Sequence, residues 1–328
     1  MKALVYTGPE SLEYRDAADP TVADGEELVR IEKVGICGSD MHAFLGHDER
    51  RPAPLILGHE AAGIITGGPR DGKRVTINPL RSCGTCVACK TGRNNLCPSR
   101  QIISMPPREG AFAEWVPMQS DNLVEVPEGV LPEKAALAEP LACGWHAARL
   151  AIASNYSGAE GNCLVIGGGA IGVGAALCLA AQGVKDITLV EPNDTRRSYL
   201  ERTLAFRCIR PEDLNDGDQF DMIVDGVGYA QTRASTTTYA RPGGVIAHIG
   251  LGSGEGGLDI RRMTLQEITF FGTYAYTAQD FQETAQAIFD GRLGALDWTE
   301  TRPLSDGARA FTDIRAGTVE APKIILTP

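Results

Sequence analysis

The stretch Val165-Ile166-Gly167-Gly168-Gly169-Ala170-Ile171-Gly172 decides how this chain is organised. The apolar run that leads into it, from Asn162 to Ile166, predicts a short buried strand. The small apolar residues after it, as far as Gln182, predict a helix. Glycines at its third, fifth and eighth positions fit the pattern G-x-G-x-x-G. A turn of this kind between a strand and a helix is typical of dinucleotide binding.

Each glycine of this turn has its own expected role. Gly167 permits the tight turn, Gly169 lets the backbone approach a pyrophosphate, and Gly172 lets the helix pack against the strand. Ala170 and Ile171 complete the turn before the helix, whose free N–H groups and positive dipole end favour phosphate. We therefore expect this turn to hold the cofactor.

An acidic residue follows the next strand where a ribose-binding group is expected. The strand Asp186 to Val190 leads into Glu191, which lies 19 residues after Gly172, close to the expected ~20. Glu191 would accept the adenosine ribose hydroxyls and repel a 2′-phosphate, so NAD is expected in preference to NADP. Arg196 and Arg197, one or two helical turns on, could instead contact the adenine or a phosphate. A glycine-rich turn in a fold without a nucleotide is the alternative, which the strand, helix and acid together disfavour.

Composition limits the function classes that the chain can serve. A length of 328 residues is enough for two domains of roughly 150 each, and a net charge of −11 disfavours a nucleic-acid partner. No apolar run approaches the ~20 residues that a membrane-spanning helix needs. The first residues, Met1 to Tyr6, predict a strand and not an export signal. We therefore expect a cytoplasmic protein that binds neither nucleic acid nor membrane.

Four of the nine cysteines lie close together in the sequence. Their spacing, C-x2-C-x2-C-x7-C, predicts a closed structural zinc site in a lobe at about residues 80–100. An odd number of cysteines without an export signal argues against a disulfide framework. An iron–sulfur cluster is the competing interpretation, since it also takes four cysteines. The expected zinc ligands are Cys83, Cys86, Cys89 and Cys97.

A second set of metal-binding residue types precedes this cluster. Cys37, Ser39 and His42 fall within six residues after a predicted strand, and His59 and Glu60 follow about twenty residues later. Thiolate, imidazole and carboxylate are the ligand types of a catalytic zinc that keeps one position open. Taken alone, Cys37 and His59 would more often be structural, but the neighbouring motifs favour a metal site.

Glu139 is a further candidate because it lies in the apolar sequence Ala138-Glu139-Pro140-Leu141, beside a helix expected at 133–138. An acid in such surroundings has a buried partner or contacts a metal, since an unpaired buried charge is costly. The alternative is an ordinary acid at a helix end.

The remaining pattern predicts a doubly wound parallel sheet, because strands alternate with helices. Strands are expected there at 220–225, 244–250 and 268–274, and an amphipathic helix follows at 280–290. The first part is β-rich, with strands expected at 28–34, 75–79, 110–116 and 123–127. The last strand, 323–326, is expected to return to that β-rich segment.

Together these motifs resemble the zinc-dependent medium-chain dehydrogenase family over nearly the whole chain. The resemblance rests on Gly35 to Asp40, Gly58-His59-Glu60, the four-cysteine lobe, the glycine turn and the closing strand. Cys37 to His42 and Ala138 to Ala142 look most like the polyol and sugar-acid branch, which includes sorbitol, galactitol-phosphate and idonate dehydrogenases.

The resemblance implies an α/β protein with a GroES-like, β-rich catalytic domain at 1–146 and 276–328. A Rossmann domain with a doubly wound parallel sheet would occupy 147–275. It further implies two zinc ions per chain, NAD, and assembly as a homodimer or homotetramer. The implied reaction is hydride transfer between NAD and a secondary hydroxyl of a polyol, sugar or sugar acid, or its phosphate.

The residue roles follow from the same resemblance. Cys37 and His59 would hold the catalytic zinc, with Glu60 or Glu139 as a further ligand, and the zinc would acidify the substrate hydroxyl. Ser39 would accept the proton and pass it through the nicotinamide ribose to His42, which exchanges it with solvent. Alternatives are a simple alcohol or amino-alcohol dehydrogenase, a zinc-free quinone reductase, and a non-enzymatic zinc-ribbon protein with a redox-sensing Rossmann domain.

Overall fold

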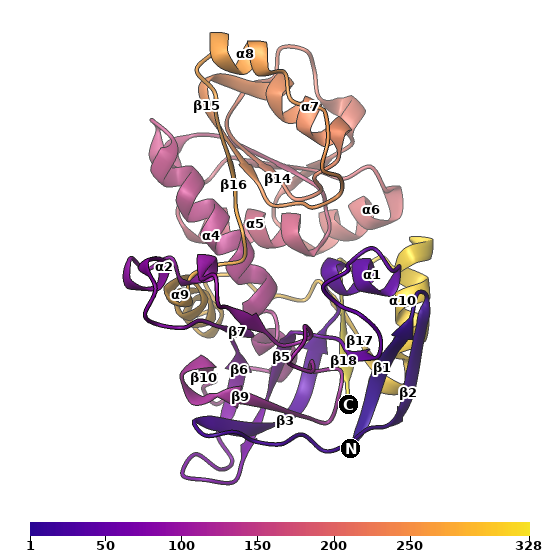
Figure 1. The fold of residues 1–328 in the computed structure, drawn as a ribbon. Helices are drawn as coiled ribbons and strands as arrows, with labels where there is room; N and C mark the ends of the chain where they lie inside the picture. The colour runs from indigo at the N-terminus through magenta and orange to yellow at the C-terminus, as the bar shows by residue number, and fades with distance from the viewer. The chain divides into compact units, whose positions relative to one another are not determined.

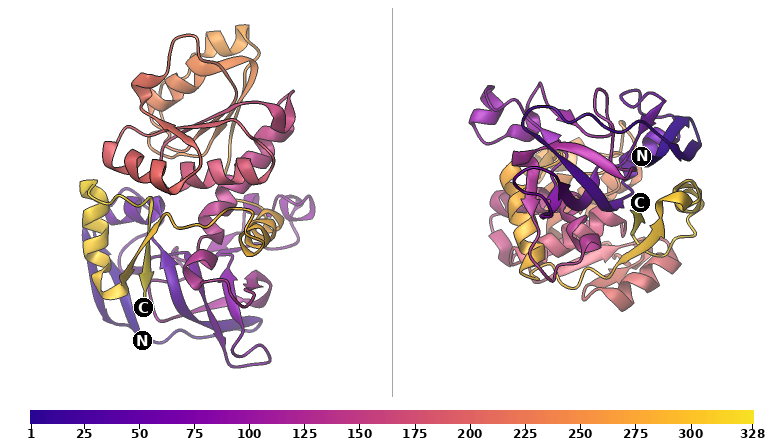
Figure 2. Two further views of the ribbon diagram at one scale, coloured as in Figure 1. Left: turned by 180° about the vertical axis from the view of Figure 1, so that it is seen from behind. Right: turned by 90° about the horizontal axis from the view of Figure 1, so that it is seen from below.

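The computed structural model describes residues 1–328, which form two compact units. The first unit comprises Met1–Glu139, Thr277–Gly291 and Thr299–Pro328, and the second comprises Pro140–Tyr276 and Arg292–Trp298. The chain therefore leaves the first unit and returns to it, and both termini lie there (Figure 2). None of the helices combines the length and the apolar character that a membrane span requires.

Strands dominate the first unit (Figure 1). They are β1 Lys2–Gly8, β2 Ser11–Asp16, β3 Glu26–Gly35, β4 Leu55–Ile56, β5 Glu60–Thr66, β6 Arg74–Ile77, β7 Leu80–Arg81, β8 Gln101–Ile102, β9 Trp115–Gln119, β10 Leu123–Glu125, β17 Thr299–Pro303 and β18 Lys323–Thr327. The largest sheet has seven strands in the order β10-β6-β5-β3-β18-β17, with β9 paired to β3. The other sheets are β2-β1-β4 and β7-β8.

The closing strand joins distant parts of the chain in one sheet. β18 pairs antiparallel with β3, so that Leu326 lies opposite Val34 and Ile325 opposite Gly35. Its apolar side chains are buried, which favours this central position in the sheet. The expectation that the last strand returns to the first segment is confirmed, and the pairing places Lys323 beside the end of β3.

The helices of the first unit are short connections apart from two near the C-terminus. They are α1 Gly38–Phe44, α2 Val87–Lys90, α3 Pro132–Ala135, α9 Ala278–Phe289 and α10 Gly307–Ala316, with the 3-10 turns η1 Asn94–Leu96, η2 Ser120–Asn122 and η5 Leu304–Asp306. α9 covers most of the amphipathic helix expected at 280–290.

The second unit is built on a six-stranded sheet in which all strands run parallel. The strands are β11 Cys163–Ile166, β12 Ile187–Val190, β13 Arg207–Ile209, β14 Phe220–Asp225, β15 Ala240–His248 and β16 Thr269–Gly272. Their order, β13-β12-β11-β14-β15-β16, reverses direction at β11. This is the doubly wound arrangement that strand–helix alternation predicts, so the fold class is confirmed.

Helices cover both faces of this sheet (Figure 1). They are α4 Ala138–Ser154, α5 Ala170–Ala181, α6 Asp194–Thr203, α7 Ala230–Tyr239 and α8 Ile260–Leu265, with the turns η3 Gly158–Glu160 and η4 Pro211–Asp213. α4, α5 and α6 lie on one face, and α7 and α8 lie on the other. α4 and α5 approach closely at Gly144, where a Cβ atom would lie 2.8 Å from the backbone nitrogen of Ala175.

One expected helix is divided. The helix expected at 133–138 ends as α3 at Ala135, and α4 begins at Ala138. Pro140 explains the break, because in a continuous helix its ring would clash with the carbonyl of Ala136, four residues earlier. In the first turn of α4 the missing N–H has no cost. α4 runs through the boundary expected at 146/147, and the domain limits stay a prediction.

Candidate active site and metal centres

The four cysteines expected to bind structural zinc gather around α2, between β7 and β8. Their sulfur atoms all lie within 4.8 Å of one another. The backbone N–H of Cys86 donates to Cys83 Sγ at 3.4 Å, and that of Cys83 donates to Cys97 Sγ at 3.4 Å. Backbone N–H groups, first that of Thr85, lower the pKa of the Cys83 thiol to about 6. Four sulfurs this close fit a tetrahedral zinc ion.

Cys37, His59 and Glu60 form a second group, in which one potential ligand atom from each residue lies within 4.8 Å of the others. Cys37 directly precedes α1, and Glu60 begins β5, which pairs with β3 so that Glu60 lies opposite Gly35. A Cβ atom on Gly35 would lie 2.1 Å from Glu60 Oε2, so only glycine leaves room for the carboxylate. Adjacent strands thus bring together residues that are distant in sequence.

The residue before His59 has to be glycine. Gly58 has a φ of +89°, and a Cβ atom there would lie 2.4 Å from Cδ1 of Phe112. Phe112 belongs to a segment that runs beside the metal site, where Ala111 N–H donates to Gly58 O at 2.8 Å. The strand expected at 110–116 is therefore wrong in its first part, because this segment bonds to 56–58 and the regular strand β9 starts only at Trp115.

Lys323 joins the second group, although no sequence motif pointed to it. Its Nζ donates to both carboxylate oxygens of Glu60, at 2.7 and 2.6 Å, and to Ile36 O at 2.7 Å. Lys323 and Glu60 are only 3% and 1% exposed. Burial lowers the pKa of Lys323, but the charges of Glu60, Cys37 and Glu139 outweigh burial and keep the pKa above its usual value. The two side chains are therefore a charged pair inside the protein.

His59 is held from several directions. Its Nδ1 lies 3.2 Å from Ser104 Oγ and 3.5 Å from Asp40 Oδ1, and its Nε2 lies 3.5 Å from Ser39 Oγ. Burial lowers the pKa of His59, but Asp40 and then Cys37 outweigh it and raise the pKa well above its ordinary value. Asp40 also accepts hydrogen bonds from Cys37 N and Gly58 N, so it links both ends of the site.

The other expected site residues of this unit lie on two helices. Ser39 and His42 are one turn apart on α1, both half-buried. Glu139 is in the first turn of α4 and only 8% exposed, but it lies outside the tight group of ligand atoms. It is close enough to contribute to the raised pKa of Lys323. The structure therefore gathers Cys37, Ser39, His59 and Glu60 closely, with Glu139 further out.

The glycine turn of the second unit fits its expected conformation. Gly167 has a φ of +104°, and a Cβ atom on Gly172 would lie 1.7 Å from Gly167 O. Gly169 precedes α5 and would meet no protein atom within 4 Å, so space remains beside the turn. Ala170 and Ile171 are the first two residues of α5, where the backbone N–H groups have no partner within the helix.

Glu191 lies at the end of β12 against this turn. Its Oε2 accepts from Gly168 N–H at 2.9 Å and its Oε1 accepts from Asn193 N–H at 2.7 Å. These bonds fix the carboxylate beside the glycine turn. Arg196 follows on α6, whereas Arg197 donates to Asp194 at 2.6 Å and to Glu191 O at 3.4 Å.

Comparisons with known proteins agree with this geometry. A family model described as an alcohol dehydrogenase GroES-like domain matches residues 23–128, and one described as a zinc-binding dehydrogenase matches residues 170–290. The L-galactonate-5-dehydrogenase of Escherichia coli (strain K12) is 30% identical over 310 residues, which cover 90% of this chain and 89% of that enzyme. The chain belongs to the zinc-dependent medium-chain dehydrogenase family.

A second relative and a solved structure were also similar to this chain. A sorbitol dehydrogenase of Bacillus subtilis (strain 168) is 31% identical over 295 residues, covering 84% of this chain and 82% of that enzyme. The crystal structure of galactitol-1-phosphate dehydrogenase from Escherichia coli shares the fold, with a TM-score of 0.87, 24% identity and full coverage of both chains. The expected family is confirmed, and the protein is an NAD(P)-dependent zinc enzyme related to polyol and sugar-acid dehydrogenases.

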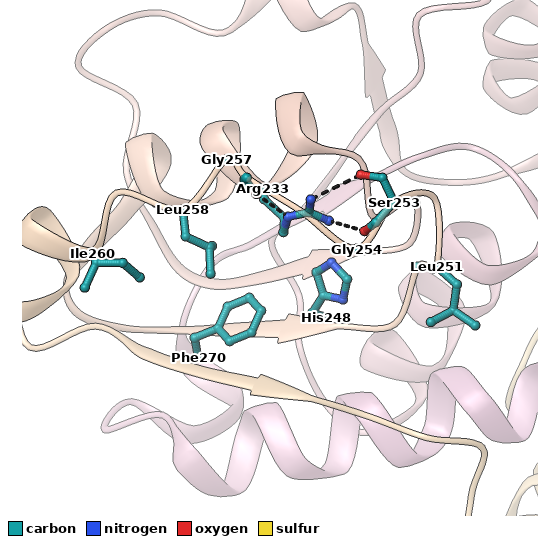
Figure 3. Close-up of a pocket in the computed structure, with 11 residues that line it drawn as sticks. Arg233, His248, Leu251, Ser253, Gly254, Gly257, Leu258, Ile260 and Phe270 are labelled. Carbon is teal, nitrogen blue, oxygen red and sulfur yellow. Dashed lines mark hydrogen bonds between the residues drawn. The ribbon is translucent and has the colours of Figure 1, made fainter.

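The second half of the dehydrogenase's parallel sheet carries a pocket of about 630 Å³ (Figure 3). It is lined by side chains from β15 and β16 and by the loop after β15, among them His248, Phe270 and Leu251. Arg233 of α7 fixes that loop, because its Nη1 donates to Ser253 O at 2.9 Å and its Nη2 to Ser253 Oγ at 3.2 Å. No sequence motif predicted this pocket.

Proposed function

We propose that this enzyme oxidises a secondary hydroxyl of a polyol, sugar or sugar acid, or of its phosphate, and that NAD+ accepts the hydride. The observation that carries the proposal is the group formed by the half-buried Cys37 and the buried His59 and Glu60, with the buried Glu139 nearby. The substrate class is supported by the named activities of relatives at about 30% identity, which act on galactonate and sorbitol by name.

The donor set suits a catalytic zinc ion, which would supply Lewis-acid activation of the substrate hydroxyl. Cys37 and His59 would be two ligands, and we propose Glu139 as the third. The reason is that both oxygens of Glu60 already bond to Lys323 Nζ. A carboxylate bound to an ammonium group is a poorer metal ligand, because the metal would have to compete with that positive charge.

Ser39 and His42 would handle the proton. Ser39 Oγ lies 3.5 Å from His59 Nε2, the nitrogen that would bind the metal in this proposal, and the half-buried His42 follows one turn later on the same helix. In this proposal the Ser39 hydroxyl takes up the proton of the substrate hydroxyl as it passes its own proton, through the nicotinamide ribose, to His42, which releases a proton to water. A histidine suits that exchange near neutral pH.

For the cofactor we propose NAD in preference to NADP. Glu191 is held against the glycine turn by two backbone N–H groups, which leaves its negative charge beside the expected ribose position. That charge would accept ribose hydroxyls and repel a 2′-phosphate. Arg197 is bonded to Asp194 and Glu191, so a compensating contact to a phosphate would fall to Arg196.

A homodimer or homotetramer is proposed as well. Leu251 and Ile260, which line the pocket, and Leu265, at the end of α8, are 73%, 62% and 68% exposed. β16 is an edge strand of its sheet, and an exposed edge with apolar neighbours favours pairing with a second copy. Sedimentation velocity of the wild type and of Ile260→Asp would test this assembly.

A substrate panel tests the function. NAD+ and NADP+ reduction would be measured with polyols, aldonic acids, polyol phosphates and simple alcohols. Fastest turnover of a polyol, aldonic acid or polyol phosphate with NAD+ is expected. Preference for simple alcohols would contradict the substrate class, and better use of NADP+ would contradict the role of Glu191.

The third ligand has its own test. Glu139→Ala should fold normally, lose most turnover and bind the catalytic zinc less tightly, whereas Glu60→Gln should keep more of the zinc. Unchanged zinc content and turnover in folded Glu139→Ala would assign the third position to Glu60.

A further inference from the structure

Ser104 adopts a backbone conformation that its side chain disfavours. Its φ is +68°, in the left-handed region that glycine tolerates and other residues rarely adopt, and the residue is completely buried. Such a conformation costs free energy and persists only where the surroundings impose it. It lies in the segment between the cysteine lobe and β9, outside every motif that indicated the function.

The side-chain hydroxyl and the backbone carbonyl of Ser104 both contact residues around the Cys37 site. Its hydroxyl oxygen lies 3.2 Å from Nδ1 of His59, and its carbonyl accepts from Nε of Arg51 at 3.0 Å. The left-handed backbone lets one residue meet the histidine with its side chain and the arginine with its carbonyl. The hydroxyl is therefore placed where a ligand histidine needs a hydrogen-bond acceptor.

Arg51 holds more than this one carbonyl. The side chain is 4% exposed, and its Nη1 lies 2.7 Å from Asp48 Oδ2 and 3.5 Å from Ser39 O. Ser39 Oγ in turn lies 3.5 Å from His59 Nε2. One buried guanidinium thus contacts the backbones of two serines whose hydroxyls stand at opposite nitrogens of the same imidazole ring.

The chemistry of a metal-bound histidine explains this arrangement. When Nε2 binds a metal, Nδ1 carries the hydrogen, and the acceptor of that hydrogen fixes the ring's orientation and basicity. Asp40 Oδ1 lies 3.5 Å from the same Nδ1 and also accepts from Gly58 N–H, so it can share the Nδ1 hydrogen with Ser104. Ser104 Oγ is the nearer acceptor.

We propose that Ser104 and Arg51 are positioning residues of the zinc site: the Ser104 hydroxyl accepts the Nδ1 hydrogen of His59, and Arg51 fixes the backbones of Ser104 and Ser39. The inference rests on the proposed zinc function of Cys37 and His59. Loss of such an outer partner typically lowers metal affinity by about 10- to 100-fold.

The test uses two variants that remove the hydroxyl but differ in backbone strain. Ser104→Ala keeps the unfavourable φ, whereas Ser104→Gly relieves it, so the glycine variant should unfold at a higher urea concentration than the alanine variant. Zinc affinity at the Cys37 site, measured by chelator competition, should nevertheless fall about 10-fold or more in both. The lobe zinc should stay in place in each, and the absorption of the cobalt-substituted site should change in each.

Glu267→Gly is the matched control, because Glu267 is an exposed residue with a φ of +52° in the second unit. It relieves a similar strain and should leave zinc affinity and the cobalt spectrum unchanged. Arg51→Lys keeps a positive charge beside Asp48 but lacks the planar guanidinium fork, so its zinc affinity should also fall.

Three results would overturn the inference. They are unchanged zinc affinity in both Ser104 variants, a loss of affinity only in the less stable one, and a loss of lobe zinc equal to that at the Cys37 site. Failure of the proposed function looks different, because the wild-type protein itself would then hold zinc only in the lobe.

Discussion

The cysteine lobe draws its donors from residues 83–97 alone, whereas the Cys37 site collects donors and supports from β3, α1, β5 and β18. Cys83 in the lobe is exposed, while Glu60 and Lys323 in the second site are almost completely buried. The lobe stabilises its sulfurs with backbone N–H groups of its own turns. The second site depends on long-range packing and a buried ion pair.

This difference indicates that the two sites are held in place by different interactions. In the lobe little besides the metal would hold four thiolates together, so the metal should organise the loop. In the second site the hydrogen bonds around Asp40 and the Glu60–Lys323 pair connect several elements through contacts that are not metal–ligand bonds. Its architecture should therefore persist when the metal is removed.

The largest expected effect is the loss of turnover in Cys37→Ser. Lewis-acid activation supplies several kcal/mol of transition-state stabilisation, which corresponds to roughly 10³-fold or more in kcat/KM. The variant should keep its melting temperature and one of two zinc ions, as measured by elemental analysis. Cys208→Ser, at a buried thiol of the second unit, is the control and should keep both ions and full activity.

Lys323→Met should cost the next largest amount, about 3–5 kcal/mol of unfolding free energy, because it leaves Glu60 charged and buried without its cation. Urea unfolding would measure the loss. The double variant Glu60→Gln with Lys323→Met removes both charges and should recover part of it. A single variant as stable as the wild type would mean that Glu60 finds another partner.

Cys89→Ser should release the lobe zinc with a local effect. Hydrogen–deuterium exchange should rise within residues 83–97, while the amides of β3 and β5 stay protected. Activity should fall much less than in Cys37→Ser. If exchange instead rises throughout the first unit, the lobe is not the independent element that its short-range contacts indicate.

The smallest expected effect is a difference between the two sites in how zinc affinity depends on pH. Metal ligands bind deprotonated, so zinc affinity falls at both sites as the pH falls. Cys83, whose pKa is about 6, competes with protons only below that pH, whereas Cys86, whose pKa is raised to about 11, competes with them across the whole range. The Cys37 site has one thiol and one imidazole beside its proposed carboxylate ligand, so fewer of its ligands compete with protons and its affinity should fall less steeply below pH 6. Chelator competition across this range measures both slopes, and equal slopes would contradict the expectation.

Candidate site residues could be predicted from the sequence where the members of a site lie close together along the chain. The lobe, the glycine turn and Glu191 each lie within one short motif, so their arrangement follows from the spacing itself. Cys37 and His59 were recognisable because their motifs are also short. The doubly wound sheet followed from strand–helix alternation, and the break before α4 could have been inferred from Pro140.

Residues that act through long-range contacts were missed for a physical reason. Lys323 lies at the start of an apolar strand, and only the pairing of β18 with β3 brings it to Glu60. Ser104 and Arg51 belong to irregular segments, and a left-handed φ at a serine leaves no trace in composition or periodicity. Their partners depend on tertiary packing that spacing does not encode.

The place of Lys323 in the chain has a consequence for how the protein is made. A ribosome completes residues 83–97 early, so the lobe can take up zinc while the chain is still growing. Glu60 has to wait for its lysine until the whole second unit and β17 have been synthesised. During that interval the carboxylate of Glu60 lacks the ammonium group that it binds in the folded protein. The buried ion pair therefore forms only at the last stage of biosynthesis, after the strand that carries Lys323 has entered the sheet.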